Sequence, residues 1–180
     1  MKELGSDIAA PSAQPPYFPV DPSLFIGDNT FCENQSKTYQ FTDLCKIPGK
    51  ATFSVTGNLV ITSFTDYAVT VTSANGGGAA TIIADFGNGV KVEKEVFSGK
   101  PSFQFQYNYF APQPVKSVLC VESDIPNRTL AQQGVTSIVF TNGVNNTVIT
   151  GNGNCRRIAN LLCVKATLTN ACGSTTIDYE

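Results

Sequence analysis

The sequence predicts an all-β protein built from two tandem antiparallel β-sandwich modules that follow a proline-rich N-terminal arm. Three observations predict it. From Lys37 onward, apolar residues recur at every second position, as in strands with one buried face. Glycine, asparagine and proline interrupt this alternation at intervals of about ten residues, a spacing typical of sandwiches and barrels. No window shows sustained helical periodicity, and "RTLAQQG" (128–134) has room for one helical turn at most.

The chain has 180 residues, which is enough for two small domains. We expect an arm over residues 1–24, a first module over 25–100 and a second over 101–180. The segment "AAPSAQPPYFPVD" (9–21) is dense in proline and has no periodicity, so it is extended. Tyr17, Phe18 and Phe25 are the aromatics expected to anchor the arm on the sandwich surface. The boundary near Lys100 follows from "SGKPS" (98–102), because glycine and proline end strand pairing.

Five runs in the first module read as strands: "KTYQFT" (37–42), "KATFSVTGNLVITS" (50–63, divided by Gly57-Asn58), "DYAVTVTS" (66–73), "TIIADF" (81–86) and "VKVEKEVF" (90–97). The last two form a hairpin, because Gly87-Asn88-Gly89 between them is rich in residues that accept positive φ. Asp85-Phe86-Gly87 also matches a magnesium-binding tripeptide of protein kinases. The other kinase motifs are absent, so we interpret it as a turn.

In the second module we expect strands in "SFQFQYNYF" (102–110), "VKSVLCV" (115–121), "VTSIVFT" (135–141), "NTVIT" (146–150) and "NLLCVKATLTNACGSTTIDYE" (160–180). In the last run Leu162, Val164, Ala166 and Leu168 are expected to point inward, and residues 170–173 to turn. The strand order across residues 123–154 stays open.

The composition disfavours several functions. A net charge of −2 offers no basic footprint for nucleic acid, and no apolar run approaches the ~18 residues of a membrane span. The absence of histidine removes the commonest general base and metal ligand, so we expect no enzyme. No cofactor is expected either. Calcium is the alternative, with Asp85, Asn88 and Asp66 as candidate ligands, although an aspartate beside a glycine turn usually serves the turn itself.

Six cysteines in a chain with only 14% charged residues favour disulfides and a secreted location over a metal site: Cys32, Cys45, Cys120, Cys155, Cys163 and Cys172. Connectivity is not readable from sequence, because six cysteines allow fifteen pairings. We expect Cys32 to pair with Cys45 at the start of the first module. The other four are expected to bond within the second. Arg156-Arg157 is interpreted as a solvated loop pair.

Three stretches resemble the Ig-like and PKD-like repeats of large exported Bacteroidota proteins, many of them cargo of type IX secretion. They are "IGDNTFCENQSKTYQF" (26–41), the run from "FSVTGNLVITS" (53–63) to "VKVEKEVFSGKPS" (90–102), and "CVKATLTNACGSTT" (163–176). The resemblance implies Ig-like sandwiches at the cell surface. It also implies that the chain is a segment of a longer exported protein, with neighbouring repeats or other surface proteins as partners.

The expected function is therefore non-catalytic and structural or adhesive: a stalk, adhesin or polymer subunit. The alternative is a carbohydrate-binding accessory module of a secreted enzyme, with polysaccharide as the partner. Its platform would be the aromatic residues of the run that opens the second module: Phe103, Phe105, Tyr107, Tyr109 and Phe110. One face of an alternating strand is more often core, and we expect core packing here.

Overall fold

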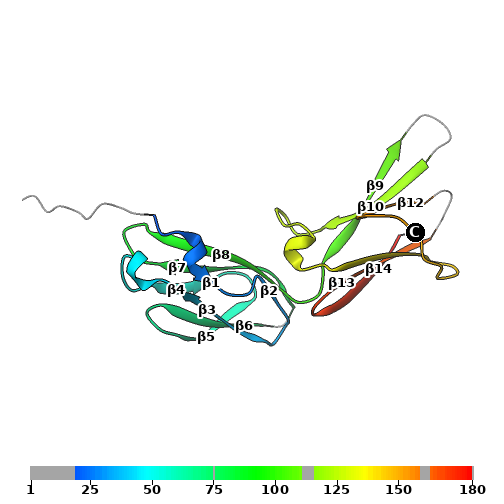
Figure 1. Ribbon diagram of the computed structural model, residues 1–180. Helices are drawn as coiled ribbons and strands as arrows, with labels where there is room; N and C mark the ends of the chain where they lie inside the picture. Colours follow the sequence, from blue (N-terminus) through cyan, green and yellow to red (C-terminus); the bar gives the residue numbers. More distant parts are fainter. Residues whose placement is uncertain (1–18, 75, 111–115, 159–162, 180) are drawn as a thin grey trace, which may run out of the picture.

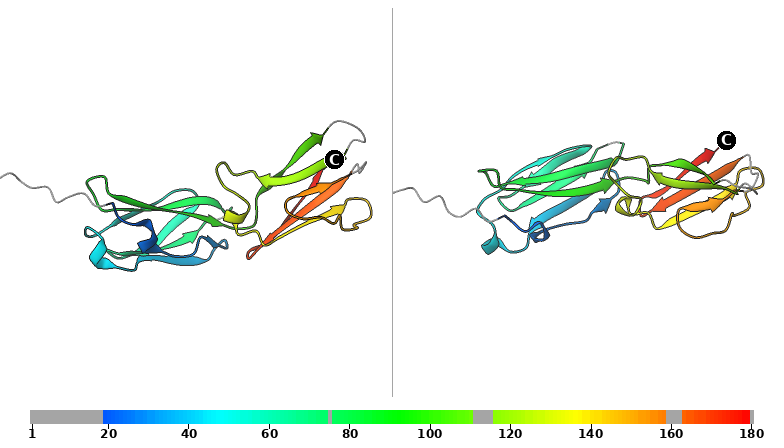
Figure 2. Two further views of the ribbon diagram at one scale, coloured as in Figure 1. Left: turned by 45° about the horizontal axis from the view of Figure 1, so that its top comes forward. Right: turned by 90° about the horizontal axis from the view of Figure 1, so that it is seen from above.

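The computed structural model describes residues 19–74, 76–110, 116–158 and 163–179. They form two β-sandwiches joined end to end, module 1 and module 2 (Figure 1). Two further views show the same elongated arrangement (Figure 2). The described chain begins at the far end of module 1, and its last strand ends at the far end of module 2. The all-β fold is confirmed.

Module 1 contains eight of the described strands: β1 (Phe25–Ile26), β2 (Thr30–Phe31), β3 (Ser36–Phe41), β4 (Thr52–Val55), β5 (Leu59–Phe64), β6 (Ala68–Ser73), β7 (Gly78–Asp85) and β8 (Lys91–Ser98). One sheet has the order β1-β3-β6-β5 and the other β2-β8-β7-β4. All pairs are antiparallel except β2 with β8. Strands β1, β3, β6 and β5 take the places of A, B, E and D in an Ig domain, and β4, β7 and β8 take those of C, F and G.

The core of module 1 follows the predicted alternation. Along β6 the buried residues include Val69 and Val71, and along β8 they include Val92 and Val96. The β7–β8 hairpin is confirmed, with full pairing from Gly78↔Ser98 to Asp85↔Lys91. Two 3-10 helices, η1 (Pro22–Leu24) and η2 (Leu44–Lys46), were not predicted, because a single turn is too short to show helical periodicity. An aspartate caps each of them.

The start of module 1 differs from the expectation. Phe25 is not a surface anchor: it is 2% exposed and stacks on Phe41 with ring centroids 4.8 Å apart. Val20 also belongs to the core, and Leu24 packs against it. The reason is that β1 pairs with β3 and turns Phe25 inward. Tyr17 and Phe18 lie outside the described residues.

Module 2 contains six described strands: β9 (Phe103–Phe110), β10 (Lys116–Ser123), β11 (Ser137–Asn142), β12 (Cys155–Arg157), β13 (Val164–Asn170) and β14 (Gly173–Tyr179). Their sheets are β12-β10-β9 and β11-β13-β14. These correspond to strands E-B-A and C-F-G of an Ig domain, so both modules share one topology. The helical turn allowed for "RTLAQQG" is present as η3 (Ala131–Gln133).

Two segments of module 2 differ from the prediction. The run "NTVIT" forms no strand; its Val148 makes a single bridge to Thr141. Strand β12 was not predicted, because three residues are too few to show a period. The β13–β14 hairpin is confirmed, and Val164, Ala166 and Leu168 are buried as expected. Leu162 lies outside the described residues.

The aromatic face of β9 divides between core and surface. Phe103 is buried and Phe105 packs against the core, as predicted. Tyr107 is 43% exposed and stacks on Tyr179 at 6.1 Å between ring centroids. The side chains of Tyr109 and Phe110 lie outside the described part of the chain. Of the described aromatics on β9, two belong to the core and one lies on the surface, so they do not form a flat exposed platform.

Candidate functional site

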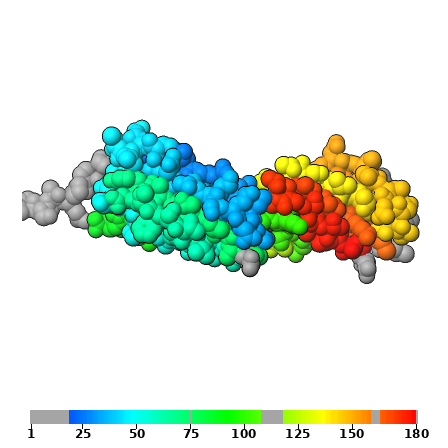
Figure 3. Space-filling model, turned by 90° about the horizontal axis from the view of Figure 1, so that it is seen from below, coloured from blue at the N-terminus to red at the C-terminus, as the bar shows by residue number. Residues whose placement is uncertain are grey.

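The junction between the modules brings together three segments that are distant in sequence. They are the turn after β2, the link from Gly99 to Pro101, and the β13–β14 turn at residues 170–173. A disulfide between Cys32 and Cys172 joins the first segment to the third across a sequence separation of 140. The surface of the early part of module 1 meets that of the last hairpin (red) at this point (Figure 3).

Local backbone structure places Cys32 at the end of module 1. Strand β2 runs parallel to β8, and the Gly99 N–H donates to the Phe31 carbonyl at 2.9 Å. A tight turn follows, in which Asn34 adopts φ 61 and the Gln35 N–H donates to the Cys32 carbonyl. Asparagine tolerates this left-handed conformation better than most residues do. The turn places the Cys32 sulfur at the tip of the sandwich, facing module 2.

Asn170 ties module 2 to the link. Its side chain is buried, and its Nδ2 donates to the carbonyls of Gly99 at 2.9 Å and Gln133 at 3.0 Å. Its Oδ1 accepts from the Cys172 N–H at 2.9 Å. One amide therefore holds the link, η3 and the cysteine-bearing turn in a fixed arrangement, with both ends of the side chain satisfied.

Gln133 is the second buried amide at the junction, and it is fully inaccessible to solvent. Its Oε1 accepts from the Ser102 N–H at 2.7 Å, and its Nε2 donates to the Ser102 carbonyl and to Ser123 Oγ, each at 2.8 Å. These bonds fix the first residues of module 2 against η3. No sequence signal predicted this burial, because glutamine is usually exposed.

Contacts between the modules add to these bonds. Arg128 of module 2 forms an ion pair with Glu95 of β8, with 3.7 Å between Nη2 and Oε2. Gly77 and Gly99 approach so closely that a Cβ on Gly99 would lie 3.2 Å from the Gly77 Cα, and both have positive φ. A side chain at Gly99 would push the link away from module 1, which is a physical reason for glycine in "GKP".

The observed disulfides correct the expected pairing. Cys32 bonds with Cys172 rather than Cys45, which is a free thiol. Within module 2 only Cys120 and Cys155 are paired, as direct neighbours on β10 and β12. Cys163 is free. The Cys120–Cys155 bond lies within module 2 as expected. The Cys32–Cys45 pairing was wrong because it kept the bond of Cys32 within module 1, whereas Cys32 lies at the pole that faces module 2.

The candidate calcium ligands are engaged in the protein itself. Asp85 Oδ1 accepts from the Gly87 N–H at 2.8 Å, and Lys91 Nζ lies 3.2 Å from Oδ2. The Gly87 N–H and then Lys91 hold the pKa of Asp85 below its ordinary value. Asp66 Oδ2 pairs with Lys50 Nζ at 2.7 Å, and Asn88 is a turn residue with φ 51. Among the described residues no three histidine, cysteine or acidic side chains gather into a metal site.

Arg156 corrects the interpretation of a solvated pair. It lies on β12, is 7% exposed, and places its guanidinium 4.9 Å from the Phe140 ring centroid. Its nitrogens donate to four backbone carbonyls, those of Ile149, Asn152, Gly153 and Cys155. Burial lowers the pKa of the guanidinium. The role of Arg156 is structural, because it satisfies the carbonyls of the loop before β12. Arg157 is exposed, as expected.

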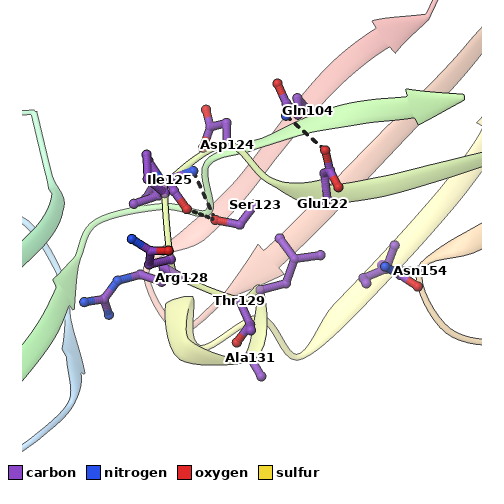
Figure 4. A pocket seen from close by; sticks show the side chains of 13 residues that line it. Gln104, Glu122, Ser123, Asp124, Ile125, Arg128, Thr129, Ala131 and Asn154 are labelled. Carbon is purple, nitrogen blue, oxygen red and sulfur yellow. Dashed lines mark hydrogen bonds between the residues drawn. The ribbon is translucent and has the colours of Figure 1, made fainter.

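An open depression of about 920 Å³ lies on module 2 beside η3 (Figure 4). Its polar lining includes Gln104, Glu122 and Asp124. Gln104 Nε2 donates to Glu122 Oε1 at 3.1 Å, and Ser102 Oγ donates to Asp124 Oδ2 at 2.7 Å. The depression thus presents hydrogen-bonding groups that already have partners.

Comparison with known proteins gives no match to any protein-family model and none to a curated protein by sequence. Solved structures of Ig proteins are similar in part. The complex of Dpr2 Ig1-Ig2 with DIP-Theta Ig1-Ig3 matches 87% of this chain and 61% of that chain, at 14% identity and a TM-score of 0.36.

The insect immune protein hemolin is matched over 88% of this chain and 45% of its own, at 10% identity and a TM-score of 0.29. Sidekick-1 immunoglobulin domains 1-5 are matched over 84% of this chain and 37% of that chain, at 8% identity and a TM-score of 0.26. The chain thus spans less than two thirds of each of these structures. The Ig-like fold is established by the strand order, not by these likenesses. The described helices are single 3-10 turns, and none is long and apolar enough to cross a membrane.

Replacing Asn170 by aspartate is expected to destabilise the junction. The substitution keeps the shape and the bond from the Cys172 N–H, but it turns a donor into a carboxylate oxygen facing two buried carbonyls. We expect the free energy of unfolding, measured by urea denaturation, to fall by about 3 kcal/mol, because the new carboxylate is charged and lacks a donor. Asn145→Asp is the matched control, because exposed Asn145 accepts hydrogen bonds from Thr147 through Oδ1, which a carboxylate also does. Equal stability of both variants would contradict the role given to Asn170.

Proposed function

We propose that the chain is a non-catalytic structural segment: two Ig-like modules held in line as a stiff spacer with adhesive surfaces, in a large exported cell-surface protein. The observation that carries the proposal is the Cys32–Cys172 disulfide across the junction. Domains joined by one flexible link move relative to one another by default. Here the modules are connected twice, by the peptide link at Gly99 to Pro101 and by the disulfide.

The geometry of the poles supports a spacer. The described chain enters at the far end of module 1 and β14 ends at the far end of module 2 (Figure 1). Force or contact applied at either end therefore acts along the whole rod. Asn170 bonds the link at Gly99, and Gln133 holds η3 to the start of module 2, so bending at the link would break the Asn170–Gly99 hydrogen bond as well as separate surfaces.

The surface supports contact with other proteins. Strands β5 and β4 are sheet edges in module 1, and such edges are open to strand addition. In module 2, β11 and the loop that follows it expose Val139, Val144 and Val148, which are 36%, 79% and 63% exposed. Disulfides form in oxidising compartments, which supports a secreted or surface location. The motif resemblance supports a Bacteroidota protein exported by type IX secretion.

The spacer role predicts that removing the inter-module disulfide loosens the rod. In Cys32→Ser/Cys172→Ser we expect small-angle X-ray scattering to show a broader distribution of interatomic distances than in the unmodified protein. The control is Cys120→Ser/Cys155→Ser, which removes a disulfide inside one sheet and leaves the junction intact. If the two variants scatter alike and match the unmodified protein, the disulfide does not limit bending and the proposal fails.

A carbohydrate-binding accessory module is the second candidate, favoured by the open depression with amide and carboxylate groups near Gln104 and Glu122. The two candidates differ in affinity electrophoresis through gels that contain soluble polysaccharides. The spacer role predicts unchanged mobility in every gel. Saturable retardation that Glu122→Gln abolishes would favour the second candidate instead.

A further inference from the structure

Two cysteines are left unpaired in a chain whose other four form disulfides, and they lie at opposite poles of the rod. Cys45 is exposed on η2, in the loop between β3 and β4 at the far end of module 1 (Figure 1). Cys163 is partly exposed and directly precedes β13. Strand β13 runs from there to Asn170 at the junction, so Cys163 lies at the far end of module 2. The two thiols of one molecule are therefore kept apart.

The pole that carries Cys45 corresponds to the pole of module 2 that carries Cys172. In both modules the hairpin equivalent to strands F and G turns at this pole: β7–β8 in module 1 and β13–β14 in module 2. Cys172 sits in the turn itself. Cys45 sits in the neighbouring loop, which the contact of Phe41 with Phe86 places beside the β7–β8 turn, with ring centroids 5.2 Å apart.

The pole that carries Cys163 corresponds to the pole of module 1 that carries Cys32. Cys163 directly precedes β13, as Gly77 directly precedes β7. A Cβ on Gly77 would lie 3.1 Å from Glu33 Oε1, so this position adjoins the turn that bears Cys32. Each module thus has one cysteine at each pole, and the observed junction joins one pole of module 1 to the opposite pole of module 2.

We infer that Cys163 of one molecule forms a disulfide with Cys45 of a second copy of this chain, extending the rod head to tail. The proposal builds on the spacer function and names its partner. It repeats between molecules the pole-to-pole bond that Cys32 and Cys172 make within one. Such a contact joins two different surfaces and does not close on itself, so it produces an open chain.

The chemistry is thiol–disulfide exchange with a low-molecular-weight disulfide such as glutathione disulfide. The exposed Cys45 thiolate attacks one sulfur of glutathione disulfide and displaces one glutathione thiol. The Cys163 thiolate of the second copy then attacks the mixed disulfide at the Cys45 sulfur and releases the other glutathione. Both cysteine thiols lose a proton, and the two electrons reduce glutathione disulfide to two glutathione molecules.

The test is incubation of the purified chain in a glutathione redox buffer, followed by non-reducing electrophoresis. A ladder of dimers, trimers and longer species is expected, with the Cys45–Cys163 peptide pair found by mass spectrometry. Cys45→Ser and Cys163→Ser each retain one free thiol and should stop at dimers at most. Mixing the two variants should give several-fold more mixed dimer than either variant gives alone. Alkylation of the free thiols with iodoacetamide should abolish the ladder without any substitution.

Monomers that carry glutathione on Cys45 or Cys163 would overturn the inference, because the thiols would react without meeting. Same-residue dimers as abundant as the mixed dimer would also overturn it, since collision alone would explain them. Either result would leave the scattering of the single rod unchanged, so failure of the polymer is distinguishable from failure of the spacer.

Discussion

The structure depends on one constraint: the Cys32–Cys172 bond, which fixes the tip of one sandwich to the tip of the next. In the chain-entropy model, closing a loop of this length restricts the unfolded chain by about 5 kcal/mol, against about 4 kcal/mol for the Cys120–Cys155 loop. The bond therefore contributes to stability and also sets the geometry. The buried amide of Asn170 adds to that geometry, since it bonds the link at Gly99 as well as η3, and Gln133 holds η3 to the start of module 2.

The two modules share one topology, but different contacts stabilise each of them. Module 1 uses a parallel β2–β8 pair and an aromatic cluster around Phe25 and Phe41. In module 2 each sheet has three described strands instead of four, and the module adds a disulfide between neighbouring strands and a buried arginine on Phe140. Small sandwiches bury modest cores, so such additions make up for limited apolar area.

Alternation with a period of two was sufficient to predict most strands, because each has one buried face. The β7–β8 and β13–β14 hairpins were predicted with their turns, since glycine and asparagine mark them. What failed depends on contacts between distant segments. Cys32 lies beside Cys172 only because the two modules dock tip to tip, and Arg156 is buried where four carbonyls and the Phe140 ring surround its guanidinium. The junction carries a partial signal: Cys32, "GKP" and the turn with Asn170 belong to the motifs noted in the sequence, but the motifs do not say that they meet.

The most direct measurement is peptide mapping of the unreduced protein by mass spectrometry after blocking of free thiols. The account predicts that the peptide containing Cys32 is linked to the one containing Cys172, with Cys45 and Cys163 blocked in the monomer. A link between Cys32 and Cys45 would contradict it, because the modules would then be joined by the peptide chain alone.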